Sequence, residues 1–262
     1  MKKVMSLLLI LVLVLSLAAC GTKAPANDGD DETDGGSTAA DTLIGGTEAG
    51  FAPYEYMEGD QVVGIDMDIS QAIADAMGKK LEIKNMDFDG ALLAVQQGKL
   101  DFVAAGVSIN EERAKQVDFS SEYVNSTEVV VVNKANPTVT GGTAEDLKDK
   151  VVGVQQGNIA DFWVEENTET REIKRYTKFV QAAEDLANGK IDCIVMDQYP
   201  AEDLVGSNDK LMILDGDPLF EDKYAIAVKK GNTELLDQIN TVIDQLIADG
   251  KIDEFTANHT SK

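Results

Sequence analysis

The sequence predicts an α/β protein whose folded part is divided into two lobes. After the first forty residues, short β-prone apolar runs alternate with amphipathic segments, a pattern typical of parallel β/α units. Residues 129–132 form an apolar strand-like run, and the Pro- and Gly-containing segment after it indicates passage into a second lobe. We expect residues 224–248 to return to the first lobe. Two crossings, near residues 130–133 and 219–224, would then form a hinge.

Composition excludes several classes of function. The chain has 262 residues, with 47 acidic and 23 basic side chains, and its net charge of −24 disfavours nucleic acid as a partner. Its single histidine, His259, and its two cysteines, Cys20 and Cys193, argue against a metal cluster and a Ser/His/Asp triad. We therefore expect no metal, no cofactor and no catalytic residue. Cys193 lies within an apolar strand-like run, which favours a buried, inert thiol.

The first forty residues read as a targeting region and a tether. Residues 1–19 form a signal peptide, because their uncharged run of sixteen residues spans about 24 Å as a helix, less than the hydrocarbon core. The run ends in Leu-Ala-Ala-Cys, which resembles the bacterial lipobox and implies lipid attachment at Cys20. The alternative is an ordinary cleavage site with a chance cysteine. Residues 20–40 are small, polar and acidic, so we predict a disordered tether.

The remaining chain divides into short predicted elements. We expect strands at residues 42–45, 62–64, 81–83, 101–104, 129–132, 151–154, 172–176, 191–195, 211–214 and 224–228, and helices at 67–77, 92–97, 145–148, 159–166, 179–187 and 233–248. Ligand sites of such folds lie at the carboxyl ends of strands. Three loops fall there: residues 48–51, 87–89 and 105–108.

The segment from Ala105 to Arg113 carries the most specific chemistry. A strand gives way to Gly106 and Ser108, and Asn110 then signals the start of a helix. The guanidinium of Arg113 can reach back over the turn and clamp a carboxylate in a bidentate, charge-assisted pair. Ser108 would add a hydroxyl donor. The alternative is a turn whose serine and arginine satisfy only local backbone and solvent.

Several motifs in order resemble those of family 3 solute-binding proteins, the polar amino acid receptors of ABC transporters. They are GTEAGFAPYE at 46–55, VGIDMDI at 63–69, AAGVSINEER at 104–113, VDFS at 117–120 and VGVQQG at 152–157. The resemblance spans residues 41–258. It implies a two-lobed periplasmic-binding-protein-like fold (type II), each lobe a mixed sheet flanked by helices, with a two-stranded hinge. Lobe 1 would be residues 41–131 plus 222–262, and lobe 2 residues 132–221.

The resemblance also implies how the two ends of an amino acid are held. Arg113 matches the arginine that binds the α-carboxylate, with Ser108 and the backbone of Ala105 and Gly106 completing that end. Asp197 matches the aspartate that binds the α-ammonium. Its alternative role is that of a solvated carboxylate at a strand end.

Further positions match the part of the family site that surrounds the ligand. Phe51 and Phe88 match aromatic residues that sandwich the ligand side chain, although loop aromatics can also belong to the core. Glu48 lies at a position where family members that bind ligands with cationic or amide side chains carry an acid. Asn158 and Ile159 stand where the family often has Ser or Thr, so Ile159 removes a hydroxyl.

The implied function is that of a receptor lipoprotein that captures a polar or basic L-amino acid between two lobes and delivers it to a membrane permease. We expect an exported monomer, held on the extracellular face of the cell membrane through Cys20, in a Gram-positive cell. One alternative is a dehydratase-like enzyme on the same fold, for which Glu48 is the candidate acid. Another is a ligand-sensing domain without a transporter.

Overall fold

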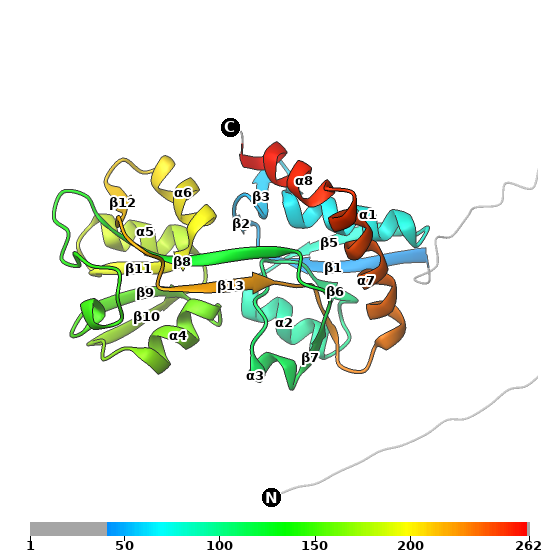
Figure 1. The fold of residues 1–262 in the computed structure, drawn as a ribbon, viewed down its shortest axis with the longest axis horizontal. Helices are drawn as coiled ribbons and strands as arrows, with labels where there is room; N and C mark the ends of the chain where they lie inside the picture. Colours follow the sequence, from blue (N-terminus) through cyan, green and yellow to red (C-terminus); the bar gives the residue numbers. More distant parts are fainter. Residues whose placement is uncertain (1–40, 261–262) are drawn as a thin grey trace, which may run out of the picture. The chain divides into compact units, whose positions relative to one another are not determined.

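The computed structural model describes residues 41–260, which belong to one compact unit (Figure 1). The predicted signal peptide, the tether and Cys20 lie outside the described residues. Within residues 41–260, two mixed sheets carry the fold, and a small three-stranded sheet joins β2 (Gly50–Phe51), β3 (Glu55–Glu58) and β4 (Gln61–Val63). The α/β class and the mixed sheets flanked by helices are thus confirmed.

The first sheet combines parallel strands with one antiparallel insertion. Its order is β5 (Lys80–Asn85), β1 (Thr42–Thr47), β6 (Phe102–Val103), β14 (Ala227–Lys229) and β7 (Val117–Phe119). The first three strands are parallel, and β14 is antiparallel to both of its neighbours. Thus a strand from late in the chain, β14, completes the sheet that β1 begins.

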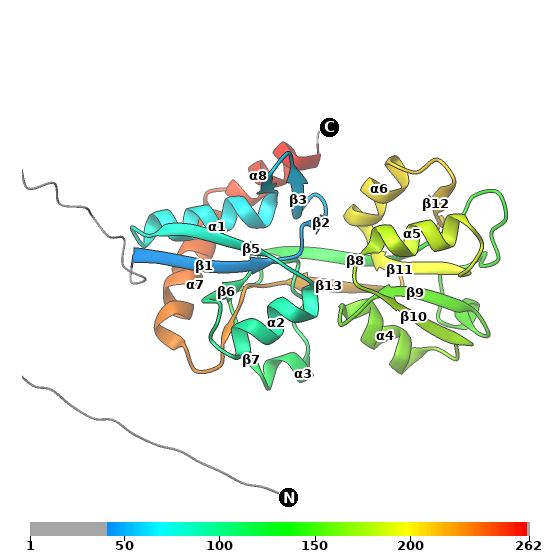
Figure 2. The same cartoon turned by 180° about the vertical axis from the view of Figure 1, so that it is seen from behind.

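Helices cover both faces of this sheet (Figure 2). They are α1 (Ile65–Ala76), α2 (Phe88–Gln96), α3 (Glu111–Ala114), α7 (Thr233–Ala248) and α8 (Lys251–Thr260). Phe102 packs in the same apolar cluster as α1 and α7, whereas its neighbour Val103 packs in the cluster of α2. Successive strand residues point to opposite faces, so α2 covers the face opposite to α1 and α7.

The second sheet is also mixed. Its order is β10 (Glu172–Tyr176), β9 (Val151–Gln155), β11 (Cys193–Asp197), β8 (Val124–Asn133) and β12 (Leu211–Ile213), and β13 (Phe220–Tyr224) also pairs with β8. It is accompanied by α4 (Ile159–Asn167), α5 (Phe179–Ala187), α6 (Gln198–Gly206) and a 3-10 turn at Glu145–Leu147. Cys193 is fully buried in this sheet, as expected of an inert thiol.

Two antiparallel strands link the sheets. β8 and β13 run side by side, with Glu128 opposite Phe220 and Val124 opposite Tyr224 (Figure 1). β8 follows the first sheet's β7, and β13 leads back to its β14. The predicted lobe boundaries, between residues 131 and 132 and between 221 and 222, fall inside these strands and stay a prediction.

The structure differs from the sequence-based expectation at several elements. Helices α6 and α8 were not predicted, and residues 145–148 form a single 3-10 turn instead of a helix. The aromatic loop after Glu48 was expected to be irregular, but Gly50 and Phe51 pair with β3. Strand β11 extends to Asp197, so this carboxylate belongs to the strand itself and immediately precedes α6.

Candidate functional site

Strand ends bring the predicted polar residues to one region. Glu48 follows β1, Ser108 lies in the segment after β6, and Asp197 ends β11. Their side chains are buried, with 1–2 % of their surface exposed, and Arg113 is 7 % exposed. The described residues therefore include a set of charged groups withdrawn from water, which is costly unless they have partners.

Arg113 contacts segments that follow strands of both sheets, after β6 and after β9. Its backbone is fixed by Asn110, which caps α3 by accepting a hydrogen bond from the Arg113 N–H at 2.8 Å. One terminal nitrogen donates to the Ser108 carbonyl and the other to the Gly157 carbonyl, each at 2.6 Å. Nε is buried without a partner among the described residues. Burial lowers the pKa of Arg113 to about 10, so the group stays charged and keeps a donor available.

Asp197 is held by hydroxyl groups and has one open oxygen. Tyr224 and Ser126 donate their hydroxyls to Oδ1, the latter at 3.2 Å. Oδ2 is buried and has no donor among the residues described. The pKa of Asp197 is raised to about 6, because burial and the charge of Asp222 raise it more than the hydrogen bond from Tyr224 lowers it. The charge of Asp197 in turn raises the pKa of Arg113, so the two opposite charges interact electrostatically.

Two acids that sequence reasoning missed stand beside Asp197. Glu128 of β8 is fully buried and Asp222 of β13 is 8 % exposed, and carboxylate oxygens of all three acids lie within 4.8 Å of one another. Ser108 donates its hydroxyl to Asp222, so this serine is already engaged within the protein. A close acidic cluster does not by itself define a metal site, and hydroxyl donors occupy two of its oxygens. We therefore assign no metal to it.

Glu48 is paired across the site by a lysine that the sequence analysis did not consider. Lys178 Nζ lies 3.1 Å from Oε1, and Gln155 Nε2 donates to Oε2 at 3.1 Å. Oε1 accepts no hydrogen bond from the described residues, so its interaction with Lys178 is that of two opposite charges. Lys178 is 41 % exposed, so its charge is partly screened. The acid expected at the side-chain end thus already has a cation nearby.

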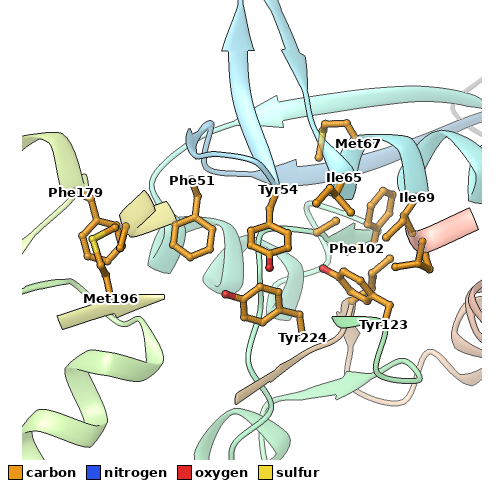
Figure 3. Packing of buried hydrophobic residues seen from close by; sticks show 14 of the residues in the cluster. Phe51, Tyr54, Ile65, Met67, Ile69, Phe102, Tyr123, Phe179, Met196 and Tyr224 are labelled. Atoms are coloured by element: carbon orange, nitrogen blue, oxygen red, sulfur yellow. The ribbon is translucent and has the colours of Figure 1, made fainter. Parts of the chain in front are cut away.

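Aromatic rings from several elements lie near one another in the apolar core (Figure 3). Phe51 stacks on Phe179 of α5 with ring centroids 6.0 Å apart, and Tyr54 meets the edge of Tyr224 at 4.9 Å. Phe88 lies instead under the Arg113 guanidinium, 5.3 Å from its ring centroid. Phe51 therefore packs on another ring, whereas Phe88 packs on a guanidinium. Phe179 is a further aromatic residue that the sequence did not single out. The predicted sandwich stays a prediction.

The remaining predicted residues lie on two turns. Gly106 has a φ of 54°, and a Cβ there would sit 2.8 Å from the Phe51 ring, so glycine is required. Its N–H donates to Asp66 at 2.9 Å, next to the buried Ala105. Asn158 caps α4 by accepting from the Ala160 N–H at 3.1 Å. Ile159, the first residue of α4, is half-buried.

The structure has two mixed sheets joined by paired strands, and a buried arginine and a buried aspartate are brought together between them. This is the arrangement of proteins that close around a small solute. Residues 43–262 match the family described as bacterial extracellular solute-binding proteins, family 3. The chain belongs to this family. Its members are substrate-binding proteins without enzymatic activity, which removes the dehydratase-like alternative.

Named relatives and solved structures agree with this assignment. The arginine-binding extracellular protein ArtP of Bacillus subtilis is 30 % identical over 97 % of this chain and 96 % of its own length. The L-cystine-binding protein TcyJ of Escherichia coli is 31 % identical over 80 % of this chain and 79 % of its own. The structure of AbpA from Streptococcus pneumoniae, bound to L-arginine, has a TM-score of 0.80 and 31 % identity, covering 85 % of this chain and 95 % of AbpA.

Between residues 41 and 260, none of the helices combines the length and the apolar character that crossing a bilayer requires.

Proposed function

We propose that this protein is the receptor of an amino acid ABC transporter and that it captures a polar or basic L-amino acid between its two lobes. The observation that carries the proposal is the pair of open polar atoms at opposite poles, Nε of Arg113 and Oδ2 of Asp197. A zwitterion offers a carboxylate to the first and an ammonium to the second. Both contacts would be charge-assisted in a site shielded from water.

The remaining residues complete this proposed site. Ser108, Ala105 and Gly106 would line the carboxylate end, and Asn158 and Ile159 would face it from the start of α4. Phe51 and Phe88 would contact the ligand side chain. Contacts of Arg113 with both Ser108 and Gly157 support a closed form that the ligand stabilises by its affinity for both halves.

Glu48 supports a ligand with a cationic or amide side chain. Its buried carboxylate lies three residues before Phe51 in the chain and would repel an acidic ligand. Arginine is the first ligand to test, because ArtP and AbpA carry it in their names or titles. TcyJ shows that relatives of equal identity are named for other amino acids.

The experiment is identification of the co-purifying ligand by mass spectrometry, followed by calorimetric titration. We expect binding of arginine, lysine, histidine or glutamine and none of glutamate. Tight glutamate binding together with no binding of these four would overturn the proposed specificity. No binding of any free amino acid would overturn the proposed function itself.

Export and anchoring form the second part of the proposal. The mature protein would be held on the outer face of the cell membrane by lipid on Cys20 and deliver its ligand to a permease. Cys20→Ser should release the protein from washed cells into the medium. Retention of this variant on the cells would contradict lipid anchoring.

A further inference from the structure

The buried face of the hinge strands is polar where it meets β11. Glu128 of β8 is the direct cross-strand partner of Asp197 on β11, and Ser126 is the partner of Asp222 on β13. Residues two apart on a strand share a face, so Ser126 and Glu128 point the same way. Tyr224 continues this face on β13. The three acids therefore meet because strand register places them together.

Within residues 41–260, no cationic side chain is paired with this cluster. In the described part of the chain, no lysine, arginine or histidine forms an ion pair with Glu128, Asp197 or Asp222. The groups that face Glu128 are Asp197 of β11, together with Asp222 and Tyr224 of β13. Arg113 influences Asp222 and Asp197 only at longer range. Neighbouring buried carboxylates cannot all be ionised under these conditions.

A single proton resolves this conflict and also supplies missing hydrogen bonds. Both oxygens of Glu128 and Oδ2 of Asp197 are buried without a donor among residues 41–260. A protonated Glu128 can donate its O–H to Oδ2 of Asp197, which gives Glu128 a partner and satisfies the open oxygen of Asp197. Burial and the charges of Asp197 and Asp222 raise the pKa of Glu128, in agreement with this protonated state.

We propose that Glu128 and Asp197 share one proton in the ligand-free protein and that the ammonium group of the captured amino acid replaces it. The inference rests on the proposed function. On capture, an ammonium N–H takes the place of the Glu128 O–H as donor to Asp197, and the proton leaves to solvent. No covalent bond other than this O–H changes. The net charge of the site is the same in both states. The two carboxylates hold one proton in the free protein and one ammonium group in the complex, so one positive charge enters as another leaves.

Proton release makes affinity depend on pH in one direction. Below the pH at which the free protein loses the shared proton, each ligand must expel it, so affinity rises as pH rises. The limit is about tenfold per pH unit, corresponding to one proton per ligand. Without a shared proton, Asp197 with its pKa of about 6 would be mostly ionised above pH 7, and affinity would be nearly flat from pH 7 to 8.

The test is calorimetric titration of the full protein with arginine, or with whichever of the candidate amino acids binds, in buffers of different ionisation enthalpy. We expect release approaching one proton per ligand and a matching rise in affinity between pH 7 and 8. Binding with no proton exchange and flat affinity overturns this inference and leaves the proposed function standing. Absence of binding by any amino acid overturns the proposed function instead.

Two variants assign the proton to a residue. Glu128→Gln keeps an N–H donor for Asp197 but holds no exchangeable proton, so its proton release and pH dependence should disappear while binding persists. Glu122→Gln removes an exposed acid of the same hinge region, paired with Lys223, and should keep the wild-type proton count. A melting curve confirms that each variant is folded. Unchanged proton release in folded Glu128→Gln overturns the proposal.

Discussion

Replacing Arg113 by methionine should abolish most of the affinity and spare the fold. Methionine retains an apolar stem of similar reach against Phe88 and removes the guanidinium. In the liganded protein this leaves a buried carboxylate without its opposite charge, a loss of about 2–5 kcal/mol. That loss corresponds to about 30- to 4,000-fold in the dissociation constant. We expect the upper half of this range, because Arg113 is only 7 % exposed and its surroundings screen charge poorly.

The stability of the ligand-free protein should change much less. Two hydrogen bonds from a charged donor contribute about 1.5–3 kcal/mol each. Against them stands the cost of burying the charge, which lowers the pKa of Arg113 from 12.5 to about 10 and is worth about 3 kcal/mol. The two effects oppose each other. Calorimetry with arginine and thermal melting without it separate binding from folding, and a variant that binds within threefold of wild type would refute the role of Arg113.

Two further predictions concern other buried acids. Lys178→Met removes the cation 3.1 Å from Glu48. Affinity for arginine should rise by up to about fivefold and affinity for glutamine should not change, because an ion pair of this exposure is worth at most about 1 kcal/mol. Weaker arginine binding in calorimetry would contradict this prediction. Glu55 is buried beside Asp66, and burial raises its pKa. Wild-type stability therefore falls as pH rises above the unfolded pKa of about 4.3, by about 1.4 kcal/mol per pH unit until the pKa of Glu55 in the folded protein is reached. Glu55→Gln should melt higher than wild type at pH 7.5 and equally at pH 4, and an equal difference at both pH values would exclude the proton as its cause.

Periodicity and turn signals predicted most of the fold because they depend on local sequence. The alternation of apolar runs indicated the parallel strands, and Asn110 and Asn158 marked helix starts that the structure confirms with capping bonds. Helix α6 was not predicted because its sequence contains Pro200 and only a short amphipathic pattern, which does not distinguish a helix from a loop. The final helix α8 is weakly apolar, so its fold depends on contacts with α1 and α7 that sequence alone does not specify.

The site was predicted where a motif carried it and missed where strand register created it. Arg113 and Asp197 were recognised from their motif positions. Glu128 meets Asp197 only through the pairing of β8 with β11, and Lys178 meets Glu48 only through the packing of segments far apart in sequence. A signal was present in β8, where Ser126 and Glu128 precede the apolar run of residues 129–132. Cross-strand pairing, which sequence does not reveal, was needed to interpret it.

A crystal structure of the protein with arginine would test the central claim most directly. We predict that the ligand's α-carboxylate accepts hydrogen bonds from Arg113, including Nε, and that its α-ammonium donates to Oδ2 of Asp197. A ligand bound with its two ends reversed, or bound away from both side chains, would contradict the account.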